Sequence, residues 1–198
     1  MVENKRILFL SPHLDDVEIS CGGTIVKFIE EGAKVFVVVF SAAKADVKEY
    51  FKSMSELGVE NPQLYNFQFR IFKTKRQEIL DKLIKIRKEI RPDIVFLPAT
   101  GDTHQDHEVI SQEGFRAFKK SSILGYQQPW ALREIKLQFF IPLEEKHIDK
   151  KIKALSFYKS QVSKFYTSAD YIKNEAKYWG SQVELLYAEI FETIRWLL

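Results

Sequence analysis

Histidine and aspartate residues gather in two short segments, and each segment follows a run of apolar residues. His13, Asp15 and Asp16 come directly after the apolar residues 7–10. Residues 101–107 contain two more of the four histidines and follow a second apolar run. Adjacent carboxylates raise one another's pKa, and a bound cation removes that repulsion. The pattern therefore indicates a metal site built from both segments.

Two imidazoles and one carboxylate, with a fourth position left open, are typical of hydrolytic zinc sites. His13, Asp16 and His107 could supply this ligand set. A cation held there polarises a carbonyl group and lowers the pKa of a water molecule to about 7. Each segment alone has a simpler explanation, because Asp15 or Asp16 could cap a helix and the second segment could be a surface loop. Their joint occurrence favours the metal site.

Three further side chains near the predicted ligands could take part in catalysis. If Asp16 binds the metal, its neighbour Asp15 cannot point the same way and is free to act as a general base. His104 lies three residues before His107 and, as an imidazolium, could stabilise an oxyanion or protonate a leaving amine. Asp106 could orient one of the imidazoles, as carboxylates beside metal ligands commonly do.

The elements that would hold these residues alternate between strands and helices. Residues 7–10, 34–41 and 93–97 are apolar runs that predict strands, and residues 24–32 predict a helix between the first two. Open sheets built from strand-helix-strand units bind ligands at the carboxyl ends of their strands. The sequence therefore predicts one α/β domain over residues 1–198, with a mostly parallel sheet and both segments at one edge of it.

The other elements are predicted from periodicity and from glycine and proline positions. Five segments have helical patterns, and Gly180 marks a bend in the last of them: residues 46–57, 74–90, 106–119, 144–163 and 169–197. Two segments predict strands, a short one within residues 59–71 and another over residues 134–141 that Pro142 ends. Residues 123–130 fit neither pattern.

Four residues have structural interpretations that compete with functional ones. Cys21 is the single cysteine, so it forms no internal disulfide, and its position favours a small buried residue over a metal ligand. Gly22 and Gly23 match neither of the glycine-rich phosphate motifs, so we expect them to permit close packing of a strand against a helix. His147 lies among charged residues and is expected on a helix surface.

Composition excludes several classes of protein. With 45% hydrophobic and 14% aromatic residues, the chain should fold into a globular core. The net charge of +3 is spread over mixed-charge segments, so no nucleic-acid partner is expected. We find neither a run of about 20 apolar residues for a membrane span nor a signal peptide. The sequence therefore predicts a soluble, cytoplasmic protein.

Both segments resemble motifs of a known family, the LmbE-like or PIG-L-like zinc-dependent N-acetyl-sugar deacetylases. Residues 11–24, Ser-Pro-His-Leu-Asp-Asp-Val-Glu-Ile-Ser-Cys-Gly-Gly-Thr, are similar to its first motif, and residues 102–107, Asp-Thr-His-Gln-Asp-His, are similar to its second. Residues 154–161 and 187–191 are also similar to family segments, so the resemblance spans nearly the whole chain.

The resemblance implies a Rossmann-like sheet with helices on both faces. It also implies hydrolysis of the N-acetyl group of an N-acetylglucosamine-type sugar or sugar conjugate, giving a free amine and acetate. Zinc, or another divalent metal, is the implied cofactor, and a homo-oligomer, trimer or hexamer, is the implied assembly. The implied roles are metal ligands for His13, Asp16 and His107, the base for Asp15, the acid or oxyanion partner for His104, and support of a histidine for Asp106.

The chain departs from the family pattern where substrate contacts are expected. The stretch after Ser41 lacks a common glycine-acid pair and residues 66–70 lack an aspartate, so substrate contacts are expected within residues 42–50 and 66–72. Separately, Tyr158 replaces a histidine found in some members. Residues 124–130 resemble a segment of members linked to surface-polysaccharide precursors, which suggests a nucleotide- or lipid-linked sugar. These departures leave the specificity open.

Two other classes of function are compatible with parts of this pattern. A nucleotide- or cofactor-binding α/β protein without metal hydrolysis would use a helix N-terminus to hold phosphate, but the glycine fingerprint is missing. A catalytically silent metal-binding protein would fill the fourth ligand position and would need no free base, whereas this chain retains Asp15 and His104.

Overall fold

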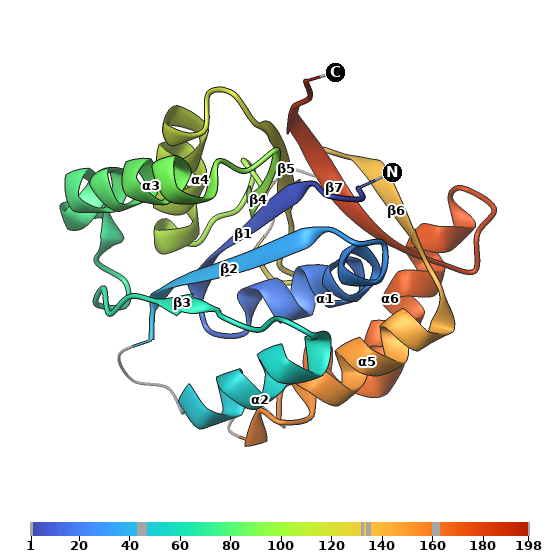
Figure 1. Cartoon of the computed structure of the whole chain (residues 1–198). Helices are drawn as coiled ribbons and strands as arrows, with labels where there is room; N and C mark the ends of the chain where they lie inside the picture. Colours follow the sequence, from blue (N-terminus) through green and yellow to red (C-terminus); the bar gives the residue numbers. More distant parts are fainter. Residues whose placement is uncertain (1, 43–46, 132, 134–135, 160–162, 198) are drawn as a thin grey trace.

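A seven-stranded sheet forms the centre of the computed structural model, which describes residues 2–42, 47–131, 133, 136–159 and 163–197 (Figure 1). The strand order is β3-β2-β1-β4-β5-β7-β6. Five strands are parallel: β1 (Arg6–His13), β2 (Lys34–Ser41), β3 (Gln63–Leu64), β4 (Ile94–Pro98) and β5 (Ser122–Tyr126). Two antiparallel strands extend the sheet: β6 (Leu137–Leu143) and β7 (Tyr187–Arg195). The prediction of a mostly parallel α/β sheet is confirmed.

Helices cover both faces of this sheet (Figure 1). One face is covered by α3 (Arg76–Ile90), preceded by the 3-10 turn η1 (Phe72–Lys75), and by α4 (Gln105–Ala117). The other face packs against α1 (Asp16–Glu30), α2 (Val47–Leu57), α5 (Glu145–Leu155) and α6 (Ala169–Ser181). In β1, Leu8 and Leu10 join the first core while Ile7 and Phe9 join the second. Burial on both faces explains why the strand is continuously apolar.

The first helix begins eight residues earlier than predicted, at Asp16 instead of residue 24. Gly22 and Gly23 look like a helix breaker in the sequence because glycine is unfavourable inside helices. Here they allow neighbours to approach, since a Cβ at Gly22 would lie 2.8 Å from Lys151 Cγ and one at Gly23 2.5 Å from Leu143 Cδ1. The expected close packing of a strand against this helix is confirmed for Gly23, which faces Leu143 of β6, whereas Gly22 faces Lys151 of α5. Asp16 becomes part of the first helical turn.

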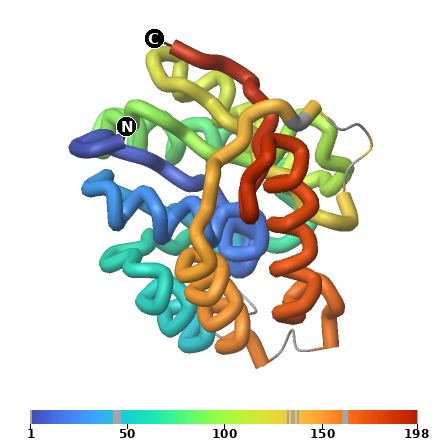
Figure 2. Tube along the Cα trace, turned by 90° about the vertical axis from the view of Figure 1, so that its right-hand side faces the viewer, coloured from blue at the N-terminus to red at the C-terminus, as the bar shows by residue number. Residues whose placement is uncertain are grey.

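The prediction of one helix over residues 169–197 is wrong, because α6 ends at Ser181 and β7 follows. Glu189 and Glu192 lie three residues apart, which imitates the polar face of a helix, yet both are buried in the strand. Glu189 accepts hydrogen bonds from Lys151 Nζ at 2.7 Å and from two backbone N–H groups of α1. Figure 2 shows β6 and β7 running side by side.

Smaller corrections concern the ends of elements. Residues 122–126 form β5, Pro142 lies inside β6, and α5 ends at Leu155 instead of residue 163. Proline is tolerated in β6 because β6 is an edge strand and needs no N–H on its open side. The predicted starts at residues 46 and 134 and the stretch 160–162 lie outside the described residues.

Two single-residue expectations have opposite outcomes. Cys21 is fully buried, as predicted. His147 is buried as well, so its expected place on the surface is wrong. Its Nδ1 accepts the Glu144 N–H at 3.0 Å in a capping box at the start of α5, and its Nε2 lies 3.0 Å from Glu30. No helix among the described residues is long and apolar enough to cross a membrane.

Gly180 is the position where α6 must leave room for the returning chain. A Cβ there would lie 2.6 Å from the Leu185 oxygen and 2.9 Å from backbone atoms of Leu186 and Tyr187. Helix propensity alone favours alanine over glycine by about 1 kcal/mol. We nevertheless expect Gly180→Ala to reduce the free energy of unfolding in urea by about 1–3 kcal/mol, because backbone atoms cannot give way as side chains do.

A control for this prediction lies in the same helix. Asn174 is exposed inside α6, so Asn174→Ala should leave the unfolding free energy unchanged or raise it slightly. If Gly180→Ala behaves like this control, the close approach between α6 and the start of β7 is incorrect.

Candidate metal centre and active site

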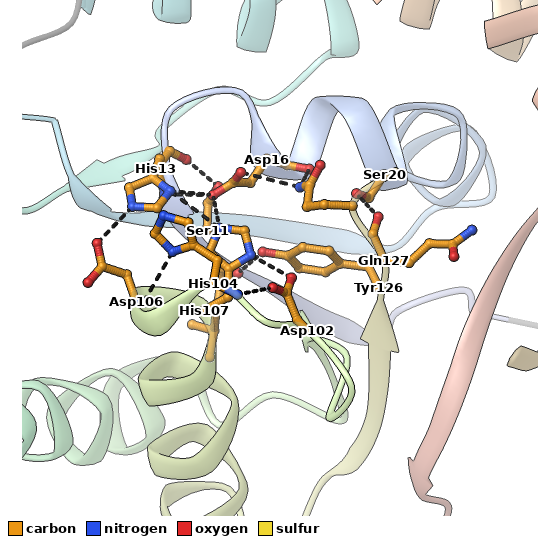
Figure 3. Close-up of polar contacts among 12 residues, drawn as sticks. Ser11, His13, Asp16, Ser20, Asp102, His104, Asp106, His107, Tyr126 and Gln127 are labelled. Carbon is orange, nitrogen blue, oxygen red and sulfur yellow. Dashed lines mark hydrogen bonds and ion pairs between the residues drawn. The ribbon is translucent and has the colours of Figure 1, made fainter. Parts of the chain in front are cut away.

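The two histidine-aspartate segments meet at one edge of the sheet (Figure 3). β1 ends at His13, β4 ends at Pro98, and the two strands are neighbours in the sheet. Because both strands are parallel, their carboxyl ends place the loop after β4 beside the start of α1. The structure thus brings together the six side chains that the sequence singles out: His13, Asp15, Asp16, His104, Asp106 and His107.

Three atoms from these side chains form a small triangle. His13 Nδ1 lies 3.2 Å from Asp16 Oδ2 and 3.3 Å from His107 Nε2, and His107 Nε2 lies 3.3 Å from Asp16 Oδ2. Tetrahedral ligands at the usual zinc distances of about 2.0–2.2 Å lie about 3.3–3.6 Å from one another. The spacing of the triangle therefore suits nitrogen and oxygen ligands around a single cation.

Each of the two triangle histidines is held from behind by an aspartate. The second ring nitrogen of His13, Nε2, lies 3.1 Å from Asp106 Oδ2, and His107 Nδ1 lies 2.7 Å from Asp102 Oδ2. Such carboxylates fix the tautomer and orientation of a metal-binding imidazole. Asp106 thus stands where the sequence predicts a supporting carboxylate. Asp102 received no role from the sequence, although an aspartate five residues before His107 is the signal that could have indicated one.

Both carboxylate oxygens of Asp16 have polar partners within the protein. Oδ2 accepts the His13 N–H at 2.8 Å, and Oδ1 lies 3.3 Å from Gln128 Nε2, which also donates to the Asp16 carbonyl at 2.9 Å. Gln128 follows β5 and is fully buried. Sequence reasoning missed it because residues 123–130 lack a recognisable pattern.

The charges of the triangle shift the pKa values of its members. Burial lowers the pKa of His13, but the charge of Asp16 and hydrogen bonds to Asp106 and Asp16 raise it to about 9. For His107, burial is likewise outweighed by Asp16 and Asp102, and its pKa rises to about 10. Burial raises the pKa of Asp16, yet the two histidines bring it well below its usual range. The negative charge of Asp16 therefore favours positive charge among the two ring nitrogens that face it.

Asp15 lies beside this triangle, at the residue that precedes α1. It is the N-cap residue of α1, but in the described part of the chain its side chain makes no capping hydrogen bond. Burial and the charge of Asp16 raise the pKa of Asp15 to about 7, against the opposing charges of Lys164, His13 and His107. The capping explanation thus does not hold for Asp15, and a carboxyl group with a pKa near neutrality suits proton transfer.

His104 caps α4 and lies next to both triangle histidines. Its Nδ1 accepts the Asp106 N–H at 3.2 Å, so the proton of the neutral ring belongs on Nε2. Burial and the charges of His107 and His13 lower the pKa of His104. The structure therefore favours a neutral imidazole that donates from Nε2 over the imidazolium expected from the sequence.

His104 also allows a second ligand set. The rings of His13, His104 and His107 offer three nitrogens within 4.8 Å of one another. This group is looser than the triangle that contains Asp16, whose three separations are 3.2–3.3 Å. In addition, Nδ1 of His104 is engaged in the helix cap. The geometry therefore favours Asp16 over His104 as the third ligand.

A cavity of about 380 Å³ opens beside His104. Its lining includes Arg70, Gln105 and Trp130. Arg70 has a left-handed backbone, with φ 67°, which aims its N–H at Asp106 Oδ2 at 2.7 Å and leaves its side chain over the Phe69 ring. Of the two regions where the sequence predicts substrate contacts, residues 66–72 contribute Arg70 to the lining of this cavity. Residues 43–46 of the other region, 42–50, lie outside the described residues.

Tyr158, which departs from the family pattern, lies behind the site. It is buried, and its hydroxyl donates a hydrogen bond to Glu18 in the first turn of α1. Ser53 of α2 donates to the same carboxylate oxygen at 3.3 Å. Tyr158 therefore supports the helix that carries Asp16 and contacts none of the three triangle atoms.

Comparison with known proteins places the chain in a family. The PIG-L model, described as GlcNAc-PI de-N-acetylase, matches residues 8–118, which is more than half of the chain. The chain therefore belongs to the PIG-L family, and the resemblance noted in the sequence is confirmed. The matched residues include both segments that form the triangle.

Two curated relatives are deacetylases. The uncharacterized deacetylase YaiS of Escherichia coli is 25% identical over 171 residues, which cover 80% of this chain and 92% of that protein. The diacetylchitobiose deacetylase of Thermococcus kodakarensis is 24% identical over 219 residues, covering 93% of this chain and 81% of that protein.

Solved structures show that proteins catalysing different reactions share this fold. The 4-carboxy-2-hydroxymuconate hydratase GalB of Pseudomonas putida superposes with a TM-score of 0.82 at 16% identity, and the match covers 98% of each chain. Several deacetylases share the fold at similar TM-scores. Because the fold accommodates different reactions, the function of this chain has to be argued from its own site.

Asp102 offers a test of the histidine support. Asp102→Asn keeps the size of the side chain but removes the charge that lies 2.7 Å from His107 Nδ1. We expect zinc affinity to fall about 10–100-fold, as is typical when a carboxylate behind a metal-binding histidine is replaced. Competition with a chromophoric chelator measures this affinity. An unchanged affinity would mean that His107 does not depend on Asp102.

Proposed function

We propose that this protein is a zinc-dependent deacetylase that hydrolyses the N-acetyl group of an N-acetylglucosamine-type sugar or sugar conjugate. The triangle of His13, Asp16 and His107 is the observation that carries the proposal. Family membership and two deacetylase relatives support the reaction type, and the diacetylchitobiose deacetylase supports a sugar substrate. A homo-oligomer stays a prediction.

The residues of the triangle fit a divalent cation with two nitrogen ligands and one oxygen ligand. Zinc accepts this combination, and three protein ligands leave a further position open, as in hydrolytic sites. A cation bound there supplies Lewis-acid polarisation of the acetyl carbonyl and lowers the pKa of water. The aspartates behind the histidines would keep both imidazoles neutral at their metal-facing nitrogens.

Asp15 is proposed as the general base. Its carboxylate takes a proton from the attacking water as the new C–O bond forms at the acetyl carbon. When the C–N bond breaks, the leaving nitrogen must gain a proton, and the Asp15 carboxylic acid is a group beside the site that can return it. Burial and the neighbouring charge of Asp16 raise the pKa of Asp15, which favours its holding the proton until the leaving nitrogen takes it.

His104 is proposed as the oxyanion partner. With Nδ1 occupied by the Asp106 N–H, the remaining donor is Nε2–H, which can stabilise the negative charge that develops on the acetyl oxygen. A neutral donor suffices for this role, so no protonated histidine is needed. Arg70 and Gln105 line the adjacent cavity and are candidates for contacts with sugar hydroxyl groups.

The site argues against the nucleotide-binding alternative. A phosphate at the N-terminus of α1 would meet the buried carboxylate of Asp16, whose pKa His107 and His13 hold well below its usual range, so that it stays negatively charged. Helix N-termini bind anions only where the first turn leaves the backbone N–H groups free of competing negative charge. We therefore expect no measurable affinity for ATP or NAD.

Metal removal tests the proposal. The purified protein is treated with a chelator, dialysed, checked for folding by circular dichroism, and assayed for acetate release from N-acetylglucosamine and N,N'-diacetylchitobiose. We expect loss of activity on chelation and recovery with about one equivalent of zinc. Cobalt, manganese and magnesium salts in parallel identify the preferred metal. Full activity of a metal-free, folded protein would contradict the proposal.

A further inference from the structure

Trp130 is a large aromatic residue that remains 48% exposed beside the candidate active site. It lies in the loop after β5 and lines the same cavity as His104 and Arg70. Its indole packs against the Tyr166 ring, with centroids 4.1 Å apart and planes 33° apart. Tyr166 itself has Lys164 Nζ 5.5 Å from its ring centroid. The indole is thus held by a neighbour while about half of its surface stays open.

The loop that carries Trp130 is hydrogen-bonded to residues 101–103, which precede His104. The Thr103 N–H donates to the Ala131 carbonyl at 2.7 Å, and the Arg133 N–H donates to the Gly101 carbonyl at 3.1 Å. These two hydrogen bonds hold the residues just after Trp130 against the segment that leads to His104. On its other side, Gln128 is bonded to Asp16. The backbone after Trp130 is therefore bonded to the segment before His104, and Gln128 on the other side is bonded to Asp16 of the triangle.

We propose that Trp130 is a stacking platform for a second ring attached to the N-acetyl sugar, and that it sets a preference for two-ring substrates. This inference rests on the proposed deacetylation. The cavity of about 380 Å³ is at the lower end of the usual range of ligand sites, about 300–1,000 Å³. With the acetyl group at the triangle, the first sugar ring occupies the space next to His104, and the exposed indole meets the second ring.

The chemistry of the indole identifies the class of ring. Its face carries negative charge density, which attracts the C–H groups of a pyranose face or the edge of an aryl ring. Arg70 lies on the same cavity and can donate hydrogen bonds to hydroxyl groups at the rim of a sugar. A saccharide ring offers both kinds of group, whereas an alkyl chain offers neither the hydroxyl groups nor a rigid flat face. We therefore infer a disaccharide or larger sugar conjugate as the substrate.

Kinetics with one-ring and two-ring substrates test the platform. For N,N'-diacetylchitobiose, Trp130→Ala should raise KM about three- to tenfold and leave kcat within about twofold, because stacking contributes equally before and during the reaction. Trp130→Phe should restore most of the affinity. N-acetylglucosamine should give the same kcat and KM within about twofold for all variants. Equal losses on both substrates, or no loss on either, would overturn the inference.

Trp196 provides the matched control. It is 43% exposed and follows the end of β7 that pairs with the start of β5. It therefore lies at the amino ends of the parallel strands, whereas the triangle lies at their carboxyl ends. Trp196→Ala should leave both substrates unaffected. If Trp130→Ala instead lowers the oligomer mass in sedimentation and leaves KM unchanged, the indole belongs to an interface between copies of the chain, and the inference is overturned.

A binding measurement separates this inference from the proposed function. If the wild-type protein releases no acetate from either substrate, the proposed function fails, but the platform is still tested. In a Trp196→Phe background, fluorescence is titrated with the disaccharide chitobiose and, separately, with glucosamine. A saturable change with chitobiose that glucosamine does not produce supports the platform, and its loss on adding Trp130→Phe, which removes the fluorophore, identifies Trp130 as the source of the signal. An equal change with glucosamine would overturn the inference. No change with chitobiose would overturn it.

Discussion

Asp15→Asn should lower kcat for acetate release about 10²–10⁴-fold, which is the usual contribution of a general base. Asparagine keeps the shape of the side chain and cannot accept the proton of the attacking water. Asp15 makes no capping hydrogen bond in the described part of the chain, so the helix loses no partner. The expected result is thus a folded protein that still binds about one equivalent of metal and is nearly inactive.

The control for this variant is an aspartate on the surface. Asp81 is exposed on α3, and Asp81→Asn should leave kcat, KM and metal content unchanged. Steady-state kinetics and elemental analysis of the same preparations give all three quantities. If Asp15→Asn retains more than about a tenth of wild-type kcat, another group is the base.

Asp16→Asn and His104→Asn should separate metal binding from oxyanion stabilisation. Asp16 Oδ2 lies 3.2 and 3.3 Å from the two histidine nitrogens, so removal of its charge should abolish stoichiometric metal binding and with it the activity. His104→Asn removes the Nε2–H donor but supplies an oxygen that can still cap α4. We expect it to bind metal normally and to lose about 10²–10³-fold in kcat.

The comparison also decides between the two candidate ligand sets. If His104 is a ligand, as the three-histidine group would allow, His104→Asn should lose the metal and Asp16→Asn should retain it. That reversed result would contradict the assignment of Asp16. Metal content per protein and circular dichroism on both variants are sufficient to distinguish the outcomes.

The sequence could predict the central sheet and the meeting of the two segments because both depend on local patterns. Apolar runs such as residues 34–41 mark buried parallel strands, and parallel strands place their carboxyl ends together. The polar residues after those strands must then lie at one edge. For the same reason, His13, Asp16 and His107 could be named as a group before their separations were known.

The missed features depend on contacts between distant parts of the chain. Glu189 occupies a buried strand because Lys151 and two N–H groups of α1 satisfy its carboxylate, and nothing near residue 189 reports those partners. His147 is buried because it caps α5 and contacts Glu30. Gln128 reaches Asp16 from a loop without a periodic pattern. A prediction from periodicity places polar residues at the surface. It therefore misses polar residues that are buried because they have hydrogen-bond partners inside the core.

Anomalous diffraction at the zinc absorption edge tests the central claim most directly. Crystals of the protein purified with zinc are measured above and below the edge, and the difference map locates the metal without reference to activity. We predict a single strong peak among His13 Nδ1, Asp16 Oδ2 and His107 Nε2. A peak bound by His104 instead of Asp16, or no peak in the triangle from crystals grown with excess zinc, would contradict this assignment.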